Sequence, residues 1–188
     1  MGLPERHPNP ESPRKRPAPV SPTPLRYPLP VTDSDAETQA LMDEGDRLAR
    51  HLAQTLDATL PDQPRLIFLG RSLALNLVRA FVPTVEHVTG RAGTPLHALL
   101  ELDERGRAVV QTVTADGELH AMLPVDDLLR DLLFVRGALN PVVRGHLQDA
   151  VRGDEHHATR ALVACLKSRP VLDAMGRQIQ GCLGKGRR

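Results

Sequence analysis

Aromatic side chains are almost missing from this chain, and their scarcity limits what its core can be. The 188 residues include no Trp, one Tyr and three Phe. The core must therefore be built from Leu, Val and Ala, which suits helices packed on one another or on a small sheet. This composition also supplies no aromatic platform for stacked bases, which argues against recognition of single-stranded nucleic acid.

Charge and cysteine content favour a soluble protein of a reducing compartment. The formal net charge of +1 gives no whole-chain argument for nucleic acid or membrane as a partner. Cys165 and Cys182 fall on apolar faces of expected helices, so we expect buried free thiols. The N-terminus lacks the apolar core of a signal peptide, and no run approaches the ~18 apolar residues of a membrane span. We expect a cytoplasmic location, no cofactor and no metal, although export without a cleaved signal stays open.

Residues 1–32 differ in composition from everything that follows. They hold ten of the seventeen prolines and the basic run Arg14-Lys15-Arg16. Because proline removes amide donors and fixes φ, this stretch is expected to be a disordered arm, partly in the polyproline II conformation. It is either a solvated tail, a ligand for a proline-reading module, a basic contact to an acidic partner, or an export-tolerant leader.

An amphipathic helix is expected to follow the arm. Ser34 and Glu37 fit a capping box, and the helix should end near Pro61. One face carries a leucine stripe, made of Leu41, Leu48, Leu52 and Leu56. The other face carries opposite charges four residues apart, in the pairs Asp43–Arg47 and Asp46–Arg50.

The segment Arg65–Val82 is the main candidate for chemistry. Arg65–Leu69 is expected to be a short buried strand that turns through Gly70, Arg71 and Ser72 into a helix. Ser72 is the expected N-cap of this helix, and Pro83 its stop.

The turn itself has three interpretations. Gly70-Arg71-Ser72-Leu73-Ala74 resembles the nucleophile elbow of α/β-hydrolases, with Ala74 where that motif has glycine. The resemblance implies Ser72 as a catalytic nucleophile. Alternatively Gly70, Arg71 and Ser72, together with Arg91 in a second Gly/Arg turn, form an anion or phosphate site. The third interpretation is a plain capped turn.

The remaining elements are a set of strands followed by a set of helices. Strands are expected at 97–102, 107–114 and 118–123, with a weaker one at 84–88 and a helix over 96–102 as the rival. Helices are expected over 126–135, from Asn140-Pro141, from Asp154 and from Pro170. Asp126 and Asp127 are interpreted as capping residues.

These expectations define an α+β protein. Residues 34–135 form a domain with a leading helix, a strand-turn-helix and a small, mostly antiparallel sheet, and residues 136–188 form a helical region with a basic tail. The helical region has three apolar stripes, which must pack on the sheet, a second copy or a partner. We therefore expect a non-enzymatic adaptor, chaperone-like or regulatory protein that binds a protein partner or forms a homo-oligomer. The alternatives are an enzyme or anion-binding domain using Gly70, Arg71 and Ser72, and a nucleic-acid binder using the basic termini.

Overall fold

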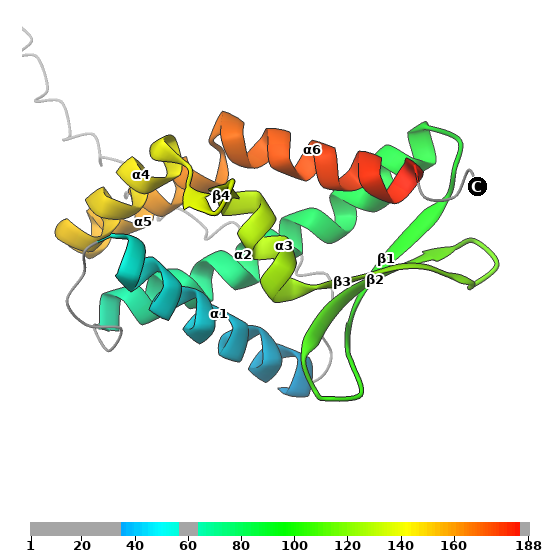
Figure 1. The fold of residues 1–188 in the computed structure, drawn as a ribbon, viewed down its shortest axis with the longest axis horizontal. Coiled ribbons are helices and arrows are strands. Elements are labelled where there is room, and N and C mark those ends of the chain that lie inside the picture. The colour runs from blue at the N-terminus through cyan, green and yellow to red at the C-terminus, as the bar shows by residue number, and fades with distance from the viewer. Residues whose placement is uncertain (1–34, 57–63, 185–188) are drawn as a thin grey trace, which may run out of the picture.

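The computed structural model describes residues 35–56 and 64–184 (Figure 1). Its elements are, in order, α1 (Asp35–Thr55), α2 (Pro64–Arg91), β1 (Leu96–Leu102), β2 (Ala108–Thr114), β3 (Leu119–Pro124), α3 (Val125–Leu133), β4 (Phe134–Val135), β5 (Ala138–Leu139), α4 (Pro141–Arg152), α5 (Glu155–Leu166) and α6 (Arg169–Gly184). This order confirms the α+β class, the leading helix, the small antiparallel sheet and the helical C-terminal region. The first helix ends at Thr55, six residues before Pro61. The arm, the Ser34 cap and the basic tail lie outside the described residues.

Helix α2 is the central element of the fold. It runs through the middle of the molecule in Figure 1, with α1 on one side and α6 on the other. It contacts α1, β1 and all four later helices. Its largest buried side chains are Leu66, Leu69, Leu73, Leu77 and Phe81. By length and composition alone, α2 is the one helix of the described part that could cross a membrane, and in this fold it supplies the core.

The predicted strand at Arg65–Leu69 was wrong, because these residues form the first turns of α2. A short apolar run fits a buried helix as well as a buried strand. Here Leu66, Leu69 and Leu73 continue a helical spacing that the rest of α2 extends, and all three are fully buried.

Pro83 does not stop this helix, so the weak strand at 84–88 was also wrong. Proline inside a helix removes one backbone hydrogen bond and crowds the preceding turn. Its ring lies on the exposed side of α2, whereas Phe81 and Val85 on either side of it have 0% exposure. Burial of these neighbours keeps the helix continuous through the proline.

Strands β1, β2 and β3 form an antiparallel sheet in sequence order, which confirms the three stronger strand predictions and rules out the rival helix. The register pairs Leu99 with Gln111 and Gln111 with Met122. The pairing of β2 with β3 has an irregularity between Thr112 and Val113, where the register shifts. The face that carries Ala98 and Val110 packs into the core.

Two of the C-terminal helices begin at the expected residues, and a side-chain cap fixes each start. The Asn140 side chain accepts a hydrogen bond from the Val142 amide at 3.0 Å, and Asp154 accepts one from the His157 amide at 2.6 Å. Both cysteines are buried, as expected, and burial raises the pKa of the Cys165 thiol to about 12. On α6, the Leu172 side chain is 51% exposed.

One continuous core joins the sheet to all six helices. The apolar stripes of α4, α5 and α6 all contribute to it, and these helices pack on α2, on α3 and on one another. The expected boundary at residue 136 falls inside the β4–β5 hairpin, with core residues on both sides of it. The stripes are therefore covered within the chain itself.

Candidate functional site

The strand-to-helix turn that the elbow resemblance requires does not form. Gly70, Arg71 and Ser72 lie well inside α2, whereas only the first four amides of a helix are free to bind an anion or stabilise an oxyanion. The Ser72 carbonyl accepts a hydrogen bond from the Asn76 side chain at 2.7 Å. Arg91 ends the same helix 20 residues after Arg71, which places it about 30 Å away along the axis. These four residues do not converge on one site.

Gly70 has a packing role instead, at the crossing of α1 and α2. A Cβ added to Gly70 would lie 2.2 Å from the carbonyl oxygen of Gly45 and 2.9 Å from the Cβ of Ala49. A Cβ added to Gly45 would lie 2.5 Å from the Cα of Arg71. The two backbones therefore touch, and only glycine on each helix allows this approach.

Arg71 also has a partner on α1. Its Nε donates to Oδ1 of Asp46 at 2.7 Å and its Nη2 donates to Oδ2 at 2.8 Å. This two-point geometry is the strongest form of an Arg–carboxylate pair. The expected intrahelical pairing of Asp46 with Arg50 is thus replaced by a bond between helices. The hydrogen bond from Arg71 lowers the pKa of Asp46, against a smaller opposing effect of desolvation.

Replacing Arg71 with methionine should weaken the protein at neutral pH and reduce its sensitivity to acid. The pKa of Asp46 is lowered in the folded state, so its contribution is present above the ordinary value of 3.8 and is lost as the pH falls through the folded value. The stability difference between wild type and Arg71→Met should therefore shrink below about pH 4. Urea midpoints at pH 7 and pH 3 measure it, with Arg79→Met as the control on the same helix. If the stability difference between wild type and Arg71→Met were the same at pH 7 and pH 3, the ion pair between Arg71 and Asp46 would be contradicted.

Arg71 and Ser72 do line a shallow apolar hollow of about 420 Å³. The other residues of this hollow belong to α1 and the first turns of α2, and are Met42, Pro64, Ile67, Phe68 and Leu75. Phe68 is 49% exposed there. The hollow can accept an apolar side chain, and it offers one guanidinium that is already bonded to Asp46.

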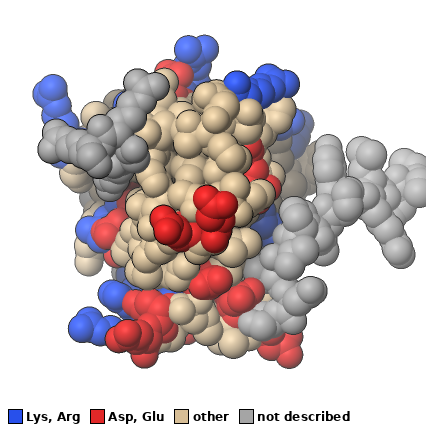
Figure 2. Space-filling model, turned by 90° about the vertical axis from the view of Figure 1, so that its right-hand side faces the viewer, with Lys and Arg blue, Asp and Glu red and all other residues tan. Residues whose placement is uncertain are grey.

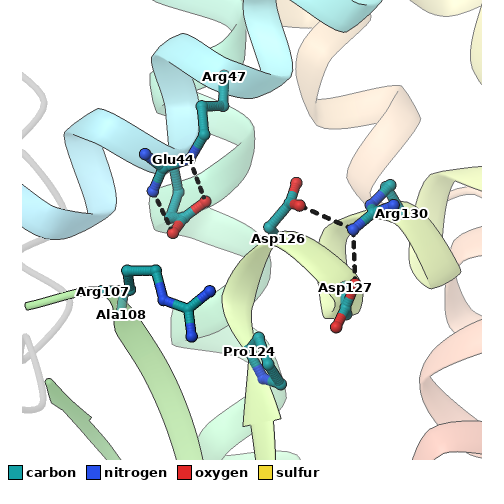
Figure 3. Close-up of a pocket in the computed structure, with 8 residues that line it drawn as sticks. All are labelled: Glu44, Arg47, Arg107, Ala108, Pro124, Asp126, Asp127 and Arg130. Atoms are coloured by element: carbon teal, nitrogen blue, oxygen red, sulfur yellow. Dashed lines mark hydrogen bonds and ion pairs between the residues drawn. The ribbon is translucent and has the colours of Figure 1, made fainter. Parts of the chain in front are cut away.

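A charged pocket of about 440 Å³ opens where α1, β2 and α3 meet (Figure 3). Its lining combines three arginines with three acids, namely Glu44, Arg47, Arg107, Asp126, Asp127 and Arg130, together with Ala108 and Pro124. Glu44 is only 3% exposed, and both of its oxygens accept hydrogen bonds from Arg47, that from Nε at 2.9 Å. In Figure 3 the Arg107 side chain extends into the space between Glu44 and Pro124.

Each guanidinium of this pocket is already bonded to a carboxylate. Arg107 donates to Asp103, and Arg130 donates to Asp126 at 2.8 Å and to Asp127 at 2.6 Å. Asp126 and Asp127 lie in the first turn of α3, as expected for carboxylates that favour the positive end of the helix dipole, but neither makes a capping hydrogen bond. With three cations against three anions, the pocket has no surplus charge to attract an ion. Within 35–56 and 64–184, no cluster of three or more His, Cys, Asp or Glu side chains could hold a metal ion.

The outward face of the three-stranded sheet carries exposed apolar side chains, with His97 and Glu101 on either side of Leu99 along β1. Leu99 (45% exposed) and Met122 (46%) flank Gln111 from the two outer strands, and Leu119 (58%) pairs with Val113 in the next row. We call these five residues the outer sheet face. Residues paired across strands share a face, and the solvated face of an antiparallel sheet is normally polar. This end of the molecule has uncharged side chains over its upper middle, acidic groups at its centre and lower part, and most of its basic groups toward the margins (Figure 2).

Comparison with known proteins adds no assignment to these features. The chain matches no protein-family model, no curated protein and no solved structure. The function must therefore be argued from the chemistry of the described surface.

Proposed function

We propose that this protein works by binding another protein, as an adaptor, chaperone-like or regulatory factor, through its outer sheet face. The observation that carries the proposal is the cluster of large apolar side chains exposed on adjoining strands, Leu99, Leu119 and Met122. Exposed apolar patches of this kind mark sites of protein association. A rigid sheet presents such a patch with little loss of side-chain order on binding.

The position of the patch revises how binding is expected to occur. The amphipathic helices were the expected docking elements, but their stripes lie in the core. Apart from Phe68 in the hollow between α1 and α2, the exposed apolar residues of the helices, Val142, Val163 and Leu172, each belong to a different helix. Scattered single residues are normal on a protein surface and need no partner. The sheet therefore replaces the helices as the proposed docking element.

The chemistry of the face also favours protein over nucleic acid. The five residues of the outer sheet face are leucine, methionine, valine and glutamine, and the residues beside Leu99 on the same face of β1 are His97 and the acidic Glu101. Nucleic-acid surfaces require cations at the phosphates. The basic termini of the alternative interpretation lie outside the described residues.

Site-specific photo-crosslinking in the producing cell tests the proposed binding role. A photoreactive residue at position 122 should give a crosslinked protein of defined mass. The same residue at position 172, equally exposed on α6, should not give that product. Adding Leu99→Lys to the position-122 probe should abolish the product, because a desolvated ammonium opposes apolar docking. Identical products from both positions, or none from position 122, would refute the assignment of this face.

A further inference from the structure

Charge is distributed unevenly around the outer sheet face. The whole chain is nearly balanced, with 24 Lys and Arg residues against 23 Asp and Glu residues. No Lys or Arg lies between Ala108 and Leu129, however, a stretch that contains β2, the β2–β3 turn and β3. The cations that flank the sheet in sequence are Arg91, at the end of α2, and Arg105 and Arg107, around the β1–β2 turn. The three strands themselves carry no Lys or Arg.

Carboxylates border this face at several points. Asp116 and Glu118 are exposed residues of the β2–β3 turn, directly before Leu119, and Glu101 lies two residues after Leu99 on the same side of β1. Among the residues that the structure describes, none forms an ion pair with these three carboxylates. The β2–β3 turn points to the right in Figure 1, toward the side shown in Figure 2, where acidic groups occupy the centre. Leu119 therefore adjoins two carboxylates that no described cation pairs.

The histidines of the sheet do not offset these carboxylates. Nδ1 of His97 lies 3.9 Å from Oε1 of Glu86 on α2, so the imidazole beside Leu99 is itself next to a further acid. His120 donates from Nε2 to the carbonyl oxygen of Cys182, in the last turn of α6. Even with His97 protonated, the outward side of β1 and the β2–β3 turn together carry a net negative charge.

We propose that the partner of the outer sheet face presents a basic amphipathic segment. Its apolar side chains cover Leu99, Leu119 and Met122, and its Lys or Arg side chains meet the bordering carboxylates. This inference rests on the proposed protein-binding role and names the chemistry of the partner. Apolar contact supplies most of the affinity, whereas complementary charge speeds association and selects the partner. The charges of the turn act over about 8 Å at physiological ionic strength, which reaches a ligand seated on the adjoining strands.

Two designed peptides test the preference for a basic partner. The basic probe is an amphipathic helix of Leu and Lys, and the acidic probe has Glu in place of every Lys. When each is titrated into the full-length protein at physiological ionic strength, the basic probe should bind about tenfold more tightly than the acidic one, and added salt should weaken its binding. Equal affinity for the two probes, no binding of the basic probe, or binding that salt does not weaken would overturn the proposal.

Charge reversals on the protein locate the effect. The variant Asp116→Lys/Glu118→Lys changes only exposed residues of the turn, and it should bind the basic probe about tenfold more weakly while circular dichroism stays native. The control Asp149→Lys/Glu155→Lys makes the same change of net charge at exposed positions of α4 and α5, and it should keep the wild-type affinity. Equal losses in both variants would overturn the proposal, because the attraction would then come from net charge alone.

Photo-crosslinking from position 122 separates this inference from the binding role on which it rests. Adding Asp116→Lys/Glu118→Lys to that probe should strongly reduce the crosslinked product, and adding Asp149→Lys/Glu155→Lys should not. A product that survives reversal of the turn charges would refute the basic partner and leave the protein-binding role intact. If position 122 gave no product in the otherwise wild-type protein, the binding role itself would be refuted.

Discussion

Replacing Gly70 with alanine is expected to lower the free energy of unfolding by about 2–3 kcal/mol, the upper part of the range for overpacked cores. The new methyl group would lie 2.2 Å from the carbonyl oxygen of Gly45, a backbone atom that no rotamer change can move. Helices α1 and α2 would have to separate, which would also disturb the bond between Arg71 and Asp46. Urea unfolding followed by circular dichroism measures the loss.

The matched control is Gly181→Ala. Gly181 lies in α6, and a Cβ added there would meet no atom within 4 Å. Alanine is a better helix former than glycine by roughly 0.8–1 kcal/mol, so this variant should be slightly more stable than wild type. If Gly70→Ala also gained stability, the close approach of α1 and α2 would be wrong.

Replacing Arg47 with methionine is expected to cost about 2–3 kcal/mol. It leaves the Glu44 carboxylate, only 3% exposed, without the guanidinium that bonds both of its oxygens. Breaking a buried ion pair on one side typically costs ~3–5 kcal/mol. We expect a smaller value because the Arg47 side chain is 42% exposed, so water reaches the site. Urea unfolding at pH 7 gives the difference.

The double variant Glu44→Met/Arg47→Met tests the cause of this loss. When both charges are replaced by apolar groups of similar volume, no buried charge is left unpaired, so most of the lost stability should return. Arg50→Met, one turn further along the same helix, should change stability by less than ~0.5 kcal/mol. A double variant as unstable as Arg47→Met alone would show that the arginine acts through packing of its aliphatic stem.

Local signals were sufficient to predict much of the fold. Asn140 and Asp154 cap helices because short polar side chains satisfy free amides, and this depends only on neighbours in sequence. The helical conformation of residues 65–69 could not be predicted, because a short apolar run fits both a strand and a helix and the choice is made by packing against α1. The prediction that Pro83 stops the helix was wrong for the same reason. The burial of Phe81 and Val85 outweighs the local cost of a proline inside the helix.

The candidate site was less accessible to sequence reasoning. Arg71 was recognised as unusual, but its partner Asp46 lies 25 residues earlier on another helix, and no local rule connects them. The outer sheet face was missed because the polar residue Thr112 lies on the core face of β2, whereas the apolar residues Val109 and Val113 lie on the other face, so the sequence of this strand does not alternate clearly. The clearest signal was on β1, where the exposed residues His97 and Leu99 alternate with the buried residues Leu96 and Ala98.

The central position of α2 has a consequence for how a ribosome can make this protein. Arg91 ends α2, and the last helix that covers it ends at Gly184, 93 residues later. At roughly 5–20 residues per second, translation needs about 5–20 s to cross that interval. During this time a newly made segment that is apolar enough to resemble a membrane span is exposed. Slowed translation after codon 91 should therefore increase capture of the nascent chain by holdase chaperones or by the membrane-targeting machinery.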